Sequence, residues 1–254
     1  MHESRVDSNS KAVCIEDVTV RYPFESNRAT SLKEYFIRRM TKDIQTSYLT
    51  ALNGVSAEVH IGEPFGIIGR NGAGKSTLLK VISRIIHPTN GRLRVWGKVA
   101  SLLGVGAGFH PELSGSENIY LYSALLGRTQ SYTEECYNEI VAFAELEDFI
   151  DSPIRTYSTG MIARLGFAVA MVERPDVLLI DEVLAVGDEM FQAKCKRQFK
   201  EFQDQGTTVI LVSHGLEQIE SICQTAMWLH HGEVMGIGKP SEIVKEYRRL
   251  KDPL

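Results

Sequence analysis

The chain has 254 residues, 43% of them hydrophobic and 24% charged, and both fractions are typical of a globular protein that buries a substantial core. Its formal net charge of −4 argues against nucleic acid as the main partner, because proteins that bind a phosphate backbone carry a basic excess. Four widely spaced cysteines, a polar start and the lack of an apolar run of ~18 residues predict a reducing compartment and no membrane-spanning helix.

The N-terminal part of the sequence predicts a tail followed by strands. Residues 1–11 are polar, and we expect them to form a flexible tail. A first strand follows, and we expect two more at about residues 55–61 and 65–69, the last of them short, apolar and buried. The first strand is indicated by a β-rich run that contains Val13, Ile15, Val18 and Val20.

A long insert, residues 23–48, separates the first two expected strands. Apolar residues recur in it at helical spacing, and basic residues are available for the opposite side. The apolar residues are Leu32, Tyr35, Phe36 and Met40, and the basic ones are Lys33, Arg38, Arg39 and Lys42. A surface loop whose helix packs on the core, with its charges merely solvated, is the alternative to a functional insert.

The rest of the chain predicts alternating strands and helices around a helical block. We expect a helix at 75–86, β-structure at 91–103, and two helices that each begin with a Ser-x-x-Glu capping box, at Ser114 with Glu117 and at Ser131 with Glu134. A third helix is expected at about 160–173. Strands at 177–181 and 207–213, helices at 189–202 and 216–223, a hairpin around Gly232 and a last helix after Pro240 then follow.

This order of elements predicts an α/β fold with a mixed sheet, an N-terminal antiparallel β part and an inserted helical subdomain. We expect a single domain over residues 12–254, with its core at about 12–104 and 173–254 and the helical subdomain at about 105–172.

A phosphate-binding loop of the pattern GxxxxGK[ST] lies between the third strand and the first helix. Its glycines let backbone N–H groups turn toward the phosphates, Lys75 adds a positive charge, and the hydroxyl of Ser76 can bind Mg²⁺. A glycine-rich turn without a ligand is the alternative, but the strand before the loop and the helix after it favour the phosphate site. The loop consists of Gly69, Arg70, Asn71, Gly72, Ala73, Gly74, Lys75 and Ser76.

Acidic residues and a histidine follow two later strands. Asp181 ends an apolar strand and can bind Mg²⁺, and Glu182 is placed to activate a water molecule as a general base. His214 ends the next apolar strand, where it could reach the γ-phosphate. A pair of acidic residues at a strand end is weak evidence of a catalytic site by itself, and a lone histidine is more often structural. The preceding phosphate loop favours a functional role for the acidic pair and for His214.

A second anion site is predicted where residues 157–161, Tyr-Ser-Thr-Gly-Met, precede a helix. The side chain of Ser158 and the N–H groups of Gly160 and Met161 would point toward an anion at the helix N-terminus. A serine that caps the helix without a ligand is the alternative.

With these motifs in order, the chain resembles the ATPases of ABC transporters from residue 13 to about 240. The resemblance implies that residues 69–77, including Thr77, form the Walker A loop and that 180–182 end Walker B. Residues 157–161 would be the signature loop, 185–188 the D-loop, and His214 the switch histidine. It further implies that two chains pair head to tail, so that each ATP, with Mg²⁺ on Ser76 and Asp181, also contacts Ser158 and Gly160 of the other chain.

The family has an aromatic residue that stacks on adenine. Tyr22 is our candidate, and Tyr48, beyond the insert, is the alternative. One feature departs from the family pattern: no glutamine occurs between Ser101 and Glu112, where most members have one that senses Mg²⁺.

Four features resemble the subunits that export lipid-linked polysaccharides such as O-antigen, capsule, galactan or teichoic acid. They are the Tyr-Ser-Thr-Gly-Met signature, the stretch 106–113 with its following Glu-Asn-Ile, the stretch 181–188 with its following Phe191-Gln192, and the insert, which in such relatives forms a gate helix. The resemblance implies a homodimer that hydrolyses ATP to ADP and phosphate at the cytoplasmic face of the cell (inner) membrane. There it would act as part of a translocase, bound to an integral-membrane permease.

Two other functions stay open. An exporter subunit for another cargo, a lipid or a drug, would share every nucleotide motif. A soluble ABC ATPase in translation or DNA repair is opposed by the single cassette and the negative net charge.

Overall fold

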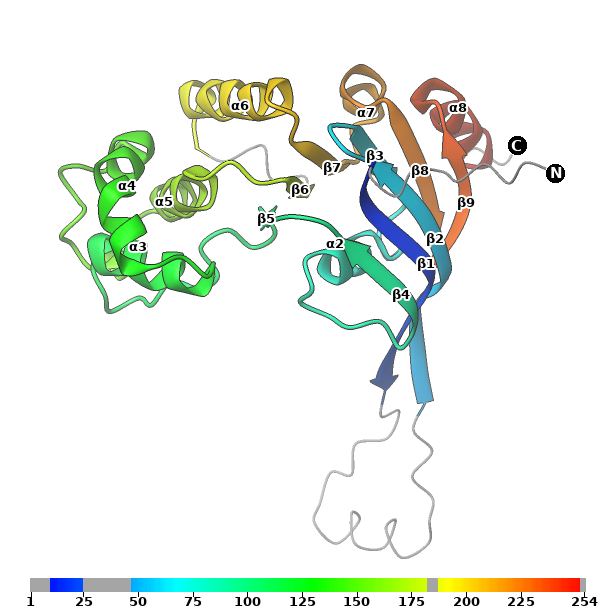
Figure 1. Ribbon diagram of the computed structural model, residues 1–254, viewed down its shortest axis with the longest axis horizontal. Coiled ribbons are helices and arrows are strands. Elements are labelled where there is room, and N and C mark those ends of the chain that lie inside the picture. Colours follow the sequence, from blue (N-terminus) through cyan, green and yellow to red (C-terminus); the bar gives the residue numbers. More distant parts are fainter. Residues whose placement is uncertain (1–9, 25–46, 182–186, 252–254) are drawn as a thin grey trace, which may run out of the picture.

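The computed structural model describes residues 10–24, 47–181 and 187–251, and their strands form two sheets (Figure 1). The smaller sheet is antiparallel and has the order β2-β1-β4, with β1 at Lys11–Phe24, β2 at Ser47–His60 and β4 at Asn90–Val95. The predicted antiparallel N-terminal part is therefore confirmed.

The larger sheet has the order β5-β6-β7-β3-β8-β9 and is parallel except for β9. Its register brings Asp181 of β6 and Ile67 of β3 level with Val212 of β7, so three carboxyl ends meet at one edge. The strands are β3 at Pro64–Ile68, β5 at Val99–Ser101, β6 at Val177–Asp181, β7 at Thr208–Val212, β8 at Thr225–His230 and β9 at Glu233–Gly238.

Helices cover the larger sheet and form a separate block beside it (Figure 1). The helices at the sheet are α2 at Lys75–Ile82, α6 at Glu189–Asp204, α7 at Leu216–Ile222 and α8 at Pro240–Lys251. The block contains α3 at Gly115–Leu125, α4 at Gln130–Ala144, the short 3₁₀ helix η1 at Ile154–Thr156 and α5 at Thr159–Met171. No helix among the described residues is long and apolar enough to cross a bilayer.

The described residues form three buried apolar clusters. The first lies between the two sheets and includes Leu52 and Leu79. The second lies on the other face of the larger sheet, where Phe191 and Phe199 of α6 pack. The third holds the helical block together and includes Leu165 of α5. The predicted division into a core and a helical subdomain at 105–172 stays a prediction.

The predicted capping boxes have different outcomes. The Ser114 side chain accepts a hydrogen bond from Glu117 N, and the Glu117 carboxylate accepts one from Ser114 N, so the first box is confirmed. The second is wrong, because Thr129 is the N-cap of α4 and accepts from Tyr132 N at 3.3 Å. Since Thr129 has the extended backbone of a cap, the helix begins at Gln130 and Ser131 already lies inside it.

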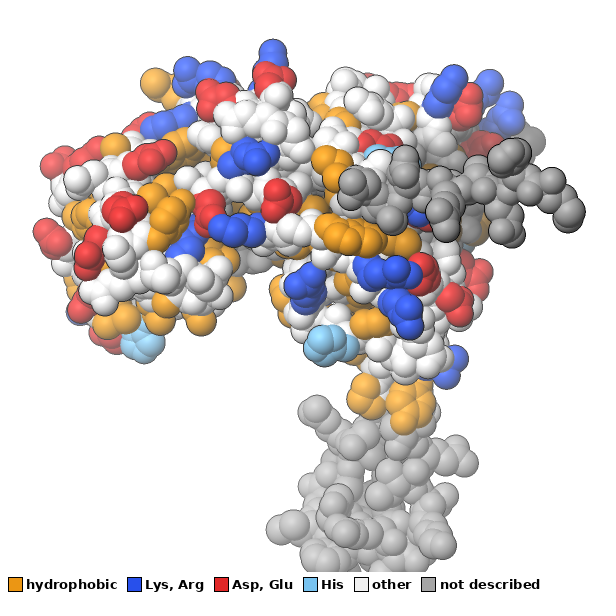
Figure 2. All heavy atoms as spheres, in the orientation of Figure 1, with side chains coloured by type: hydrophobic (Ala, Val, Ile, Leu, Met, Phe, Trp, Pro, Cys, Tyr) orange, Lys and Arg blue, Asp and Glu red, His pale blue; other side chains and the backbone are white. Residues whose placement is uncertain are grey.

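The strands that flank the insert are longer than the sequence predicts. β1 continues to Phe24, and β2 begins at Ser47 instead of residue 55, so both ends of the predicted insert 23–48 belong to strands. Its remainder, including the expected helix, lies outside the described residues, as do residues 1–9 of the predicted tail. Hydrophobic side chains are exposed at this end of the two strands (Figure 2), where β2 contributes Tyr48 and Leu49.

Candidate nucleotide-binding site

The phosphate-type loop connects the end of β3 to the start of α2, as predicted. Two of its glycines are required by close backbone contacts. Gly69 has φ of +156°, and a Cβ there would lie 2.3 Å from the Leu229 carbonyl oxygen. Gly74 has φ of +105°, and a Cβ there would lie 2.6 Å from the Ala51 carbonyl oxygen. Any side chain at either position would push the loop away from β8 or β2.

The Lys75 side chain points back into the loop. Its Nζ donates to the carbonyl oxygens of Gly69 and Arg70 at 2.8 and 3.0 Å, and the residue is 7% exposed. Burial lowers the pKa of Lys75 below its ordinary value, while the Asp181 carboxylate acts in the opposite direction. The ammonium group is thus held inside the curve of the loop, where a phosphate would need a positive charge.

A cavity of about 470 Å³ lies beside the loop. It combines the phosphate loop with residues from the carboxyl ends of β6 and β7 and from the smaller sheet. A crevice at the carboxyl ends of parallel strands is the usual ligand site of such sheets. Its lining is Tyr22, Leu49, Thr50, Ala51, Asn71, Gly72, Ala73, Gly74, Lys75, Ser76, Thr77, Asp181 and His214.

Ser76 and Asp181 meet in this cavity. The Ser76 hydroxyl donates to Asp181 Oδ2 at 3.5 Å, which brings the start of α2 to the end of β6. Among the described residues, no group of three or more His, Cys, Asp or Glu side chains could hold a metal ion. A hydroxyl and one carboxylate nevertheless fit Mg²⁺, which takes oxygen ligands and completes its octahedron with water and substrate phosphates.

His214 lies in the same cavity, just beyond the end of β7. The neighbouring Ser213 is buried, accepts a hydrogen bond from Gly215 N at 3.0 Å and donates to Gln218 Oε1 at 2.9 Å. These bonds tie the chain on both sides of His214 to the start of α7. Glu182, the predicted general base, directly follows Asp181 but lies outside the described residues.

The two candidate aromatic residues occupy different places. Tyr22 lines the cavity and packs against the first apolar cluster. Tyr48 is 62% exposed and is not among the lining residues. Tyr22 pairs with Leu49 across β1 and β2, and this pairing carries both residues to the cavity.

Sequence reasoning missed the part of the cavity that β2 provides. Leu49, Thr50 and Ala51 line it, although the sequence predicted that the strand begins at residue 55. Gly54 lies inside β2 with φ of +65°, next to an irregularity in the pairing with β1. The apolar residue Leu52 upstream of that glycine is the signal that could have extended the strand.

The predicted signature loop, residues 157–161, does not line the cavity. Ser158 is the N-cap of α5, and its hydroxyl accepts from Met161 N at 3.2 Å. Neither Ser158 nor Gly160 is among the described residues that line the cavity. One chain therefore brings together the phosphate loop, Asp181 and His214, but leaves the second predicted anion site apart.

The region that lacks a glutamine packs closely on α5. A Cβ on Gly166 would lie 2.6 Å from Val105 Cγ1 and 2.8 Å from Gly106 N. Residues 105 and 106 therefore lie directly against the backbone of α5 at Gly166.

Comparison with known proteins identifies the family. Residues 52–185, more than half of the chain, match the family model described as ABC transporter. The chain belongs to the ABC transporter family, as an ATP-binding subunit that hydrolyses ATP.

The similar curated proteins are export subunits. The O-antigen export system ATP-binding protein RfbB of Klebsiella pneumoniae is 42% identical over 92% of this chain and 96% of its own length. RfbB of Myxococcus xanthus is 45% identical over 93% of this chain, which spans only 55% of that longer protein. The teichoic acids export ATP-binding protein TagH of Levilactobacillus brevis is 40% identical over 95% of this chain and 66% of its own.

Solved structures agree on the fold. An ATP-binding subunit of an ABC transporter has a TM-score of 0.70 at 21% identity, with 93% of both chains covered. The dimeric ATP-binding cassette MJ0796, bound to ADP and Pi, has a TM-score of 0.69 at 22% identity, covering 90% of this chain and 98% of its own. The predicted ABC ATPase fold is confirmed.

Proposed function

We propose that the cavity binds ATP with Mg²⁺. The loop N–H groups and Lys75 would hold the β- and γ-phosphates, and Tyr22 would stack on the adenine ring. Ser76 and Asp181 would hold Mg²⁺, which supplies charge neutralisation when bound. Glu182 would take the proton of the attacking water, and His214 would reach the γ-phosphate.

A complete site needs a second copy of the chain. Ser158 and Gly160 lie at the start of α5, outside the lining of the cavity that holds Lys75. In a head-to-tail homodimer they would cover the γ-phosphate bound to the other chain, through the positive end of α5. A monomer would bind ATP without hydrolysing it.

The proposed cargo is a lipid-linked polysaccharide, such as O-antigen or teichoic acid. The observation that carries this is 42% identity with an O-antigen export subunit over nearly the full length of both chains. An integral-membrane permease would hold the homodimer at the cytoplasmic face of the cell membrane. Export of another lipid or of a drug is the alternative that the experiment must separate.

Depletion of the protein in its native cell tests this proposal. We expect glycans linked to undecaprenyl pyrophosphate or phosphate to accumulate inside the cell, as measured by mass spectrometry of extracted lipids. The wild-type gene should reverse this accumulation, and the Glu182→Gln variant should not. An unchanged level of lipid-linked glycans, together with another lipid or a drug retained in the cell, would favour the alternative that the protein exports that lipid or drug.

The insert offers a second test of the same proposal. Its basic residues suit an anionic glycolipid or membrane surface, where each adds about 1 kcal/mol of attraction. Arg38→Glu with Arg39→Glu should preserve ATP binding and basal ATPase activity but impair export. Arg248→Glu with Arg249→Glu, which changes two adjacent arginines that are exposed on α8, is the matched control. Lost ATPase activity in the Arg38→Glu, Arg39→Glu variant would indicate that the insert has a structural role. Unchanged export would contradict the proposal that the insert is a gate for the substrate.

A further inference from the structure

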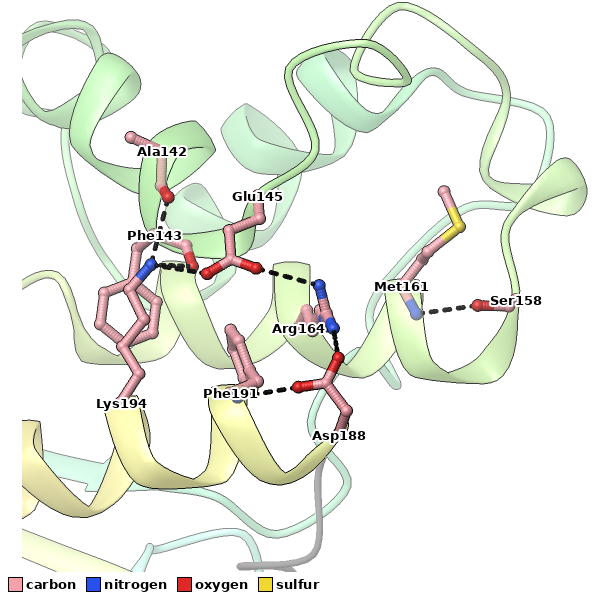
Figure 3. A network of polar contacts seen from close by, with 9 residues as sticks. All are labelled: Ala142, Phe143, Glu145, Ser158, Met161, Arg164, Asp188, Phe191 and Lys194. Carbon is pink, nitrogen blue, oxygen red and sulfur yellow. Dashed lines mark hydrogen bonds and ion pairs between the residues drawn. The ribbon is translucent and has the colours of Figure 1, made fainter.

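The residue before the predicted signature serine is buried, whereas the serine itself is exposed. Tyr157 is 8% exposed and belongs to the third apolar cluster, which holds the helical block together. Ser158 is exposed, and its hydroxyl accepts a hydrogen bond from Met161 N at 3.2 Å (Figure 3). Because this bond lies within the start of α5, it does not by itself fix Ser158 relative to the rest of the block.

The Tyr157 side chain closes the segment 149–157 on itself. Its hydroxyl donates to the carbonyl oxygen of Phe149 at 2.6 Å, and Tyr157 N donates to the carbonyl oxygen of Ile154 at 2.9 Å. Burial raises the pKa of Tyr157 to about 12, so the hydroxyl stays protonated and can donate at neutral pH. One side chain therefore connects the two ends of the segment that leads to Ser158.

The middle of this segment is bound to the chain around the start of α3. Backbone hydrogen bonds of 2.8 to 3.1 Å join residues 150–155 to residues 111–116. They run from Gly115 N to Ser152 O, from Ser116 N to Ile150 O, from Ile154 N to Leu113 O and from Arg155 N to Pro111 O. The segment before Ser158 is therefore fixed both within itself and to α3.

Asn118, in the Glu-Asn-Ile that follows the stretch 106–113, fixes the chain before α3 in turn. Its side chain is fully buried, and Oδ1 accepts from His110 N at 2.7 Å. Nδ2 donates to the carbonyl oxygens of His110 and Leu113 at 3.1 Å and of Ser114 at 2.8 Å. This buried amide gives a structural role to a motif that the nucleotide cavity does not use.

Gly115 leaves the space that the Tyr157 hydroxyl occupies. A Cβ on Gly115 would lie 2.3 Å from the hydroxyl oxygen and 3.0 Å from Cδ1 and the carbonyl oxygen of Ile150. Gly115 is the first residue of α3 and has no positive φ, so the close approach of Tyr157, and not the backbone conformation, requires a glycine there. The hydroxyl at 157 and the missing side chain at 115 therefore match.

The body of α5 is held by other contacts. Arg164, in the second turn of the helix, donates to Glu145 Oε2 at 3.3 Å and pairs with Asp188, the N-cap of α6 (Figure 3). Removal of the Tyr157 hydroxyl would thus release the loop at the start of α5 but leave the helix attached to the fold.

We propose that Tyr157 is a positioning residue that sets where Ser158 lies, through the bond to Phe149 and the fit against Gly115. In the head-to-tail dimer proposed above, Ser158 covers the γ-phosphate bound to the other chain. A displacement of about 1 Å in such a site can cost about 100-fold in rate. This inference rests on the proposed function, because Ser158 meets a nucleotide only in that dimer.

Tyr157→Phe in the full chain keeps the buried ring and removes the hydroxyl. We expect kcat to fall about tenfold, because Ser158 is then held less firmly. The Kd of ATP for the isolated chain should change less than about twofold, since Tyr157 is not among the described residues that line the cavity. The protein concentration that gives half-maximal ATPase activity should rise, because the two chains then close less readily.

Thr133→Val is the matched control in the same block. It removes a buried hydroxyl that donates to a backbone carbonyl oxygen, that of Thr129 at 3.1 Å, but it does not touch the segment before Ser158. It should lower Tm without changing kcat. A wild-type kcat in folded Tyr157→Phe would overturn the inference.

Gly115→Ala tests the fit from the other side. Its Cβ should displace the Tyr157 hydroxyl and lower kcat at least as much as Tyr157→Phe does. In the Tyr157→Phe background the same Cβ meets no hydroxyl, so the additional loss should be smaller and should reflect only the contact with Ile150. An equal loss in both backgrounds would also overturn the inference. Wild-type protein that neither dimerises with ATP nor hydrolyses it would instead contradict the proposed function.

Discussion

Ser76 Oγ lies 3.5 Å from Asp181 Oδ2, although 105 positions separate the two residues in the sequence. The contact forms because β3 and β6 both lie beside β7 and end at the same edge of the sheet. It places a hydroxyl and a carboxylate beside the loop that would hold the phosphates, and such a pair fits Mg²⁺, whose other ligands are water and substrate phosphates.

Asp181→Asn tests the metal role. We expect ATPase activity to fall at least about 100-fold, because a metal ion contributes several kcal/mol of charge stabilisation in the transition state. Binding of a fluorescent ATP analogue in EDTA should stay at the wild-type level, whereas Mg²⁺ should no longer enhance it. Asp204→Asn changes an exposed residue at the end of α6 and is the control. It should leave both the ATPase activity and the effect of Mg²⁺ on binding unchanged. Full Mg²⁺ enhancement in Asp181→Asn would exclude Asp181 as a ligand.

Lys75→Ala should weaken ATP binding and abolish turnover together, since it removes the positive charge from the phosphate loop. The change also leaves the carbonyl oxygens of Gly69 and Arg70 without their donor, at a cost of about 1–3 kcal/mol. Thermal unfolding must therefore accompany the binding titration. Lys75→Met, which keeps the length of the side chain without the charge, should lose binding in the same way. Tight ATP binding by folded Lys75→Met would show that the ammonium group is dispensable.

The sequence predicted which residues meet around the cavity better than it predicted where the strands end. The phosphate loop, Asp181 and His214 could be found because each follows an apolar strand, and parallel strands end at one edge. The contribution of Leu49 and Thr50 could not, because it depends on how far β2 continues past an irregular pairing at Gly54. Local patterns define strands and loops, but such irregularities are set by packing against other elements.

In the helical block, too, the sequence predicted local features but not those that depend on the surrounding structure. The capping box at Ser114 was predicted correctly, because the cap and its partner are neighbours in the sequence. The choice of Thr129 over Ser131 was missed, since both residues can cap a helix and the extended backbone that marks Thr129 as the cap cannot be read from the sequence. The ion pair of Arg164 and Asp188 was also missed, because nothing in the sequence places α5 beside α6.

Glu182→Gln should leave ATP binding intact and trap a dimer that encloses the nucleotide, because only the activation of water is lost. The expected decrease in hydrolysis is at least about 100-fold, the usual scale for removing a general base. Size-exclusion chromatography with and without ATP measures the dimer, and phosphate release measures turnover. Near-normal turnover would assign the activation of water to another residue.

Mixed dimers test the head-to-tail arrangement. Lys75→Ala disables the phosphate loop, and Ser158→Arg places a bulky charge at the N-terminus of α5, where it should block closure but spare ATP binding by the monomer. In a head-to-tail dimer of one Lys75→Ala chain and one Ser158→Arg chain, both defects fall in the same site and the other site is intact. The mixture should therefore recover activity that neither parent has. A mixture as inactive as the parents would contradict the arrangement.

Glu173 connects two parts of the structure and gives stability a predictable pH dependence. Its carboxylate pairs with Lys98, just before β5, and with Arg128 Nε, between α3 and α4, at 3.3 Å. Burial raises the pKa of Glu173, but Lys98 and Arg128 outweigh it, so the net pKa lies below the ordinary value. A lowered pKa stabilises the folded state above the unfolded-state value of about 4.3, and this stabilisation is lost as pH falls through the folded-state pKa.

Glu173→Gln should therefore lower the free energy of unfolding by roughly 1–2 kcal/mol at neutral pH, and the difference from wild type should shrink toward zero in acid. Urea unfolding over a pH series measures it. Arg128 keeps hydrogen bonds to the carbonyl oxygens of Val169 and Ala170, so the variant should still fold. Glu58→Gln, which removes the ion pair between Lys11 and a carboxylate more exposed than that of Glu173, is the control and should change stability less. A loss in Glu173→Gln that is the same at every pH would mean that packing, and not charge, accounts for the contribution of Glu173.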